Sequence, residues 1–149
     1  MKRISKSILG VTLLEIMLVL AIAAMIIVMS VRYYQSANTS QQANNTISQI
    51  QSIAAASDSL AQATGTYSAS VSTNAIKPLL PANGLTTPWG SSITIDSAGT
   101  NTYTVTIPGM PPGVCAIVNS QLGANAHFDP STQCGAAPAN FTYTYTSNV

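Results

Sequence analysis

The 149-residue chain is long enough for one small domain, with 6% charged and 46% hydrophobic residues. This composition is too apolar for a disordered chain and unusually poor in charge for a cytosolic one. The formal net charge of +1 argues against nucleic-acid binding as the main task, because neutralising phosphates requires clustered Lys and Arg.

The five cations are unevenly distributed along the chain. Three of them, Lys2, Arg3 and Lys6, precede a long apolar run, and only Arg32 and Lys77 follow. Basic residues before an apolar segment hold that end in the cytoplasm. The positive N-terminus is therefore interpreted as an orientation signal.

Residues 11–31 form an apolar run that a single charged residue, Glu15, interrupts. About 20 apolar residues span a bilayer as a helix, and the run reaches that length only with Glu15 included. A cleavable signal peptide fits less well, although Ala21-Ile22-Ala23 matches its small-x-small cleavage pattern, because its core should be shorter and uncharged. A plain anchor leaves Glu15 unexplained, since an ionisable group in hydrocarbon costs several kcal/mol.

The segment Leu9-Gly10-Val11-Thr12-Leu13-Leu14-Glu15, after a short basic leader, resembles the processing site of type IV prepilins. In that family a membrane aspartyl peptidase cuts after the Gly and methylates the new N-terminus. The resemblance implies that residues 1–10 are a leader that is removed. It also makes Gly10 the cleavage residue, Val11 the methylated N-terminus and Glu15 the assembly residue.

The physics of Glu15 agrees with this assignment. Cleavage after Gly10 creates an α-amino cation, and a carboxylate in a low-dielectric fibre core needs a partner of opposite charge. Such a pair sets register even where its net stabilisation is small. The alternative is that Glu15 merely reaches the membrane interface near a helix end.

One continuous helix is predicted over residues 11–64, because this stretch contains neither Gly nor Pro. Residues 11–31 are apolar all round and must be buried in lipid or in a fibre core. Gly65 is the expected helix stop. After Arg32 the helix turns polar, with one apolar stripe expected to pack on the rest of the chain: Ile47, Ile50, Ile53, Ala54, Leu60 and Ala61.

Residues 65–90 are rich in Pro and Gly and predict a connecting loop. Trp89, in a turn-like Thr-Pro-Trp-Gly segment, is interpreted as a core aromatic rather than a ligand site.

A β-sheet domain is predicted over residues 91–149. Period-2 alternation predicts strands at 92–96, 102–107 and 141–146, and Pro111-Pro112 is expected to open a helix over 113–122. The fold class is therefore α+β: a long N-terminal helix with a protruding apolar half, packed on an antiparallel sheet, the fold that the pilin resemblance implies.

Cys115 and Cys134 predict a disulfide, the default for two cysteines outside the cytoplasm. They form no CxxC redox pair, and with His127 alone they offer too few ligands for a metal. Two unpaired buried thiols are the alternative. By the resemblance, residues 115–134 form the variable surface region that the family closes with a disulfide.

Within the pilin family the chain most resembles the type IVb branch, exemplified by bundle-forming and toxin-coregulated pilins. Tyr33-Tyr34-Gln35-Ser36-Ala37 and a non-Phe first residue, Val11, agree with it. The short leader and the small region between the cysteines depart from that branch.

No enzyme and no cofactor are expected. The sequence has no Gly-x-Ser-x-Gly, no phosphate loop and no close carboxylate pair, and His127 is interpreted as a loop residue.

The resemblance implies a major pilin that polymerises with copies of itself into a surface filament for adhesion, bundling or host contact. Its expected partners are the prepilin peptidase, an inner-membrane assembly platform and the membrane itself before assembly. The expected location is the inner membrane and then an extracellular pilus on a Gram-negative bacterium. A minor pilin or a pseudopilin of a secretion, DNA-uptake or conjugation machine is the alternative, and an anchored periplasmic binding protein without cleavage at Gly10 is a third.

Overall fold

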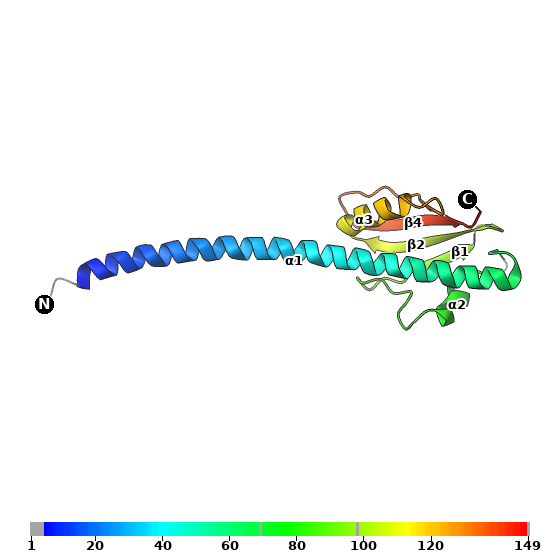
Figure 1. Cartoon of the computed structure of the whole chain (residues 1–149), viewed down its shortest axis with the longest axis horizontal. Coiled ribbons are helices and arrows are strands. Elements are labelled where there is room, and N and C mark those ends of the chain that lie inside the picture. The colour runs from blue at the N-terminus through cyan, green and yellow to red at the C-terminus, as the bar shows by residue number, and fades with distance from the viewer. Residues whose placement is uncertain (1–4, 69, 98, 149) are drawn as a thin grey trace. The chain divides into compact units, whose positions relative to one another are not determined.

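The computed structural model describes the backbone of residues 5–68, 70–97 and 99–148, and within them the side chains from Thr12 onward. The predicted α+β class is confirmed: a long N-terminal helix, apolar and exposed in its N-terminal half, packs on a four-stranded antiparallel sheet (Figure 1). The chain divides into two units, Met1–Asn38 and Thr39–Val149. The described side chains of the first unit, residues 12–38, are called the stem, and the second unit is called the head.

Helix α1 (Ser5–Thr64) supplies the stem and one layer of the head. It begins before the predicted start at Val11 and so includes part of the predicted leader. Gly65 follows it with φ at 84°, and its N–H donates to the carbonyl of Ala61 at 2.6 Å. Glycine adopts this left-handed conformation without a Cβ penalty, which explains why the helix ends there.

The sheet of the head has the strand order β1-β2-β4-β3, with β1 (Thr94–Ser97), β2 (Thr102–Met110), β3 (Phe128–Pro130) and β4 (Ala139–Thr146). Alternate residues of the two central strands are buried, as the period-2 pattern requires. The core between helix and sheet includes Ile50, Ile53, Tyr103, Val105, Ile107, Phe141 and Tyr143.

Strand β1 begins and ends later than the predicted 92–96, and two further features of the sheet differ from the sequence-based expectation. Strand β2 continues past Ile107 through an irregularity at Pro108-Gly109 to a buried Met110. Gly109 has φ at 67°, a conformation that suits a bulge. Strand β3 was not predicted, because three residues that end in a proline are too few to show an alternating pattern. Pro130 has no N–H, and it is tolerated here because an edge strand pairs with a neighbour on one side only.

The predicted loop 65–90 contains a short helix, α2 (Thr73–Ile76), and a 3-10 turn, η1 (Lys77–Leu79). The hydroxyl of Thr73 accepts from the N–H of Ile95 at 2.8 Å and lies 3.1 Å from the carbonyl of the same residue. This side chain therefore occupies backbone groups on the free edge of β1.

Helix α3 (Pro112–Gly123) follows β2 and buries Val114, Val118 and Leu122 in the core. A Cβ added to Gly113 would lie 2.9 Å from Cγ2 of Thr39, so the first turn of α3 approaches α1 so closely that a larger residue would require a shift of this side chain.

Candidate assembly surface

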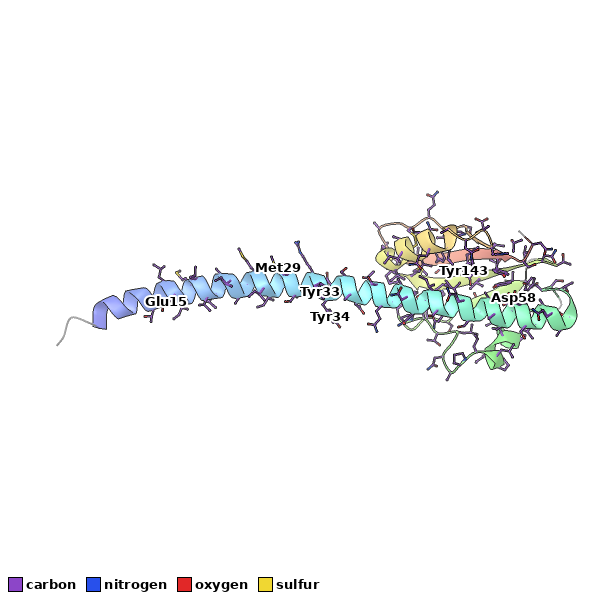
Figure 2. All side chains as sticks on the ribbon, in the orientation of Figure 1. Glu15, Met29, Tyr33, Tyr34, Asp58 and Tyr143 are labelled. Carbon is purple, nitrogen blue, oxygen red and sulfur yellow. A yellow bond between two sulfur atoms is a disulfide. The ribbon has the colours of Figure 1, made fainter. Side chains whose placement is uncertain are left out.

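The stem is a helix whose apolar side chains are covered by nothing among the described residues. A segment of α1 is long and apolar enough to cross a membrane, and none of that segment is buried. Figure 2 shows the stem side chains radiating from a single helix. Large apolar side chains from Leu13 to Val31 are between 49% and 72% exposed. Covering them would contribute on the order of 20 kcal/mol, so lipid or protein must surround this helix.

Glu15 is the one charged residue between Thr12 and Val31, and its side chain is exposed among these apolar neighbours (Figure 2). In lipid or in a protein core, its carboxylate would need a compensating partner. The stem supplies none within reach, since its cation, Arg32, lies more than four helical turns further along the same helix. The charge partner of Glu15 must come from elsewhere.

The apolar run ends at Arg32, followed by two exposed aromatic residues. Tyr33 and Tyr34 are 79% and 72% exposed. Tyrosine and arginine gather where a spanning helix leaves the hydrocarbon, because an amphipathic ring or a long cationic side chain suits the headgroup layer. This boundary leaves about 20 residues, 12–31, for the hydrocarbon.

The disulfide prediction is confirmed: Cys115 in α3 is bonded to Cys134 in the segment after β3. Cys115 is buried, and Cys134 packs against the core. A disulfide with a 19-residue separation stabilises the head mainly by restricting its unfolded state. Such bonds are typical of compartments outside the cytoplasm.

Other predicted residues take the positions expected of structural groups. The indole N–H of Trp89 donates to the carbonyl of Pro108 at 2.8 Å, with the ring packed against the core. The ring of His127 stacks on Tyr145, and its Nδ1 lies 2.8 Å from the carbonyl of Thr146. The side chains of Gly10 and Val11, like residues 1–4, lie outside the described residues, so cleavage after Gly10 stays a prediction.

One cluster in the head was missed by sequence reasoning. The carboxylate of Asp58, on α1, accepts hydrogen bonds from the hydroxyls of Tyr67 at 2.5 Å and Tyr145 at 3.3 Å. Burial, and then the hydrogen bond to Asp58 and its negative charge, raises the pKa of both tyrosines above the usual value, so both remain donors at neutral pH. No local pattern announces this cluster, because its members lie on α1, a loop and β4.

Comparison with known proteins adds no family: no protein-family model matches the chain, and no curated protein matches it. The architecture is pilin-like, and it consists of an uncovered apolar helix, a sheet domain packed on the polar part of that helix, and a C-terminal disulfide.

Proposed function

We propose that the chain is the structural subunit, the major pilin, of a type IV pilus. It is held in the inner membrane by the stem, loses residues 1–10 to a prepilin peptidase, and polymerises with copies of itself into an extracellular filament. This proposal rests on one observation: the apolar side chains of the stem are exposed, and Glu15 is the one charged residue among residues 12–31. A membrane covers such a surface first, and a bundle of identical stems covers it afterwards.

The charge balance supports assembly by self-association. In a bundle, the α-amino group at a mature Val11 of one copy can meet the Glu15 carboxylate of another, because both charges lie near the same end of each stem. Breaking one such buried pair costs about 3–5 kcal/mol, since it leaves the other charge uncompensated. The pair therefore selects one register of the stems over its neighbours.

The disulfide favours the pilin over the pseudopilin alternative. Pseudopilins usually lack a C-terminal disulfide, and here one joins α3 to the segment after β3. Strand β3 lies within the region that this disulfide closes. The quantity of subunit in sheared filaments separates the two functions, because a major pilin dominates that fraction and a minor one does not.

The processing test measures the mature N-terminus. The chain is expressed in a host with a prepilin peptidase, and the mass of the protein from the envelope and filament fractions is determined. The expected product begins at Val11 and carries one added methyl group. An intact Met1, or a start near Ala24, contradicts the proposal.

The assembly test compares Glu15→Gln with Asp129→Asn, a matched change of an exposed carboxylate on the edge strand β3. We expect Glu15→Gln to reduce sheared filaments at least about tenfold with unchanged membrane levels, because the α-amino group of the neighbouring stem loses its charge partner. The Asp129→Asn variant should assemble normally. Equal filament yields from both variants contradict a role for Glu15.

A further inference from the structure

A polar pocket of about 490 Å³ lies beside Asp58 in the head, and the proposed assembly makes no use of it. It is lined from the end of α1, the loop that follows, the β1–β2 turn and the end of β4. Its volume lies within the range of pockets that hold small ligands.

The carboxylate of Asp58 is held in place by two tyrosine side chains. Its two oxygens each accept one phenolic hydrogen bond, from Tyr67 and from Tyr145. The ring centroids of these tyrosines lie 5.4 and 4.9 Å from that of Tyr103, which is fully buried. A carboxylate has about four acceptor positions, so two remain for a ligand, in an orientation that the tyrosines have already fixed.

Apart from Ala61 and Gly65, the other residues that line the described pocket have neutral polar side chains. Three are amides, Gln62, Asn101 and Asn148, and all three are exposed. A planar amide offers a donor and an acceptor side by side, and a carboxylate offers two acceptors, an arrangement that matches adjacent hydroxyl groups on a ring.

The charged residues that line the pocket limit which class of ligand it can bind. Neither Lys nor Arg lines the described pocket, so an anionic ligand would find no charge partner. Asp58 is its one acid, whereas a calcium ion takes 6–8 oxygen ligands and usually several carboxylates. The polar wall also offers little to a lipid chain.

We propose that the Asp58 pocket binds a neutral saccharide, whose adjacent hydroxyls donate to the Asp58 carboxylate and exchange hydrogen bonds with the surrounding amides. Such a site is weak in one copy, because only one face of the sugar is covered. In a filament, many copies present the same pocket, and binding to a glycan-coated surface gains from multivalency. This last point rests on the proposed filament, and the pocket itself does not.

The test uses the full chain in phosphatidylcholine nanodiscs, which carry no sugar headgroup. Saturation-transfer NMR measures binding of the methyl glycosides of glucose, galactose, mannose and N-acetylglucosamine. N-acetylneuraminic acid, putrescine and calcium ions serve as the anionic and cationic probes. The variants are Asp58→Asn, Gln62→Ala one helical turn further along α1, and Asp96→Asn, an exposed control on β1 outside the pocket.

We expect at least one neutral glycoside to bind, with an affinity that falls about tenfold or more in Asp58→Asn and about threefold in Gln62→Ala. Asp96→Asn should bind as the parent chain does. The proposal is overturned if no neutral glycoside binds, if only the charged probes bind, or if both pocket variants bind as the parent does. Binding is measured on single copies, so a chain that binds sugar without forming filaments contradicts the proposed function alone.

Discussion

The stem and the head treat apolar side chains in opposite ways. In the stem, fourteen large apolar residues from Leu13 to Val31 are exposed, whereas in the described head Leu79 is the one large apolar side chain that is similarly exposed. The head closes its own core between α1, α3 and the sheet. The comparison teaches that the hydrophobic content of 46% is an average over a self-sufficient unit and one that must be covered from outside.

Among substitutions in the head, the largest expected effect comes from removing its disulfide. Replacing Cys115 and Cys134 together by alanine should lower the free energy of unfolding by about 3 kcal/mol, because the unfolded head gains loop entropy. The melting temperature of the head, measured by near-UV circular dichroism on the full chain in nanodiscs, should fall by roughly 10–20 °C. The helical signal that persists after head unfolding should not change, since the bond lies outside the stem. An unchanged melting temperature would show that the head does not depend on this bond.

Alkaline pH should also unfold the head and spare the stem. Burial raises the pKa of Tyr103 and Tyr143 far above the usual value of 10.0. A raised folded pKa gives stability that is complete below pH 10 and is lost as the pH rises, because only the unfolded state releases the proton. Each such tyrosine should cost about 1.4 kcal/mol per pH unit above 10.

A titration of absorbance at 295 nm alongside circular dichroism checks this expectation. Ionisation of the buried Tyr103 and Tyr143 should coincide with loss of tertiary structure. Smooth ionisation of all tyrosines in a folded head would contradict it.

Two matched tyrosine variants compare the stability contribution of a hydroxyl that donates a hydrogen bond with that of a buried hydroxyl that does not. Tyr67→Phe should destabilise the head by about 1–2 kcal/mol, because it removes a hydrogen bond to a charged carboxylate. In the described structure the buried hydroxyl of Tyr143 has no hydrogen-bond partner, so Tyr143→Phe should be neutral or stabilising. Chemical denaturation of both variants measures the difference, and the reverse order would contradict the assignment of partners.

The smallest effects should come from two glycines of α3. Gly113→Ala meets Thr39 at 2.9 Å and should destabilise the head by about 1 kcal/mol, despite a better helix propensity. At Gly123 an added Cβ meets nothing within 4 Å, so Gly123→Ala should stabilise it by up to about 1 kcal/mol. Effects of the same sign would mean that α3 does not approach α1 as closely as described.

Features with a local signal were predictable from the sequence. The continuous helix followed from the absence of breakers up to Thr64, and the two central strands from alternation such as Tyr143 and Tyr145. The pairing of Cys115 with Cys134 followed because the chain offers no other cysteine.

Features that depend on long-range contacts were not predictable. Strand β3 exists only because β4 pairs with it, and the role of Asp58 depends on tyrosines 9 and 87 positions away. Helix α2 has four residues, too few for a period, and its Ser72 cap was not distinguishable from other loop serines. Sequence periodicity predicts elements, and tertiary packing decides which polar groups meet.

The hydroxyl of Thr73 against Ile95 has a consequence for crowded copies. An unprotected edge strand can pair with an extended segment of another chain, and such pairing leads to amyloid-like stacking when many copies lie close together. Here the hydroxyl of Thr73 occupies backbone groups on the edge strand β1. The other edge strand, β3, ends in Pro130, which has no N–H to donate. Both features disfavour edge-to-edge pairing between the sheets of neighbouring heads.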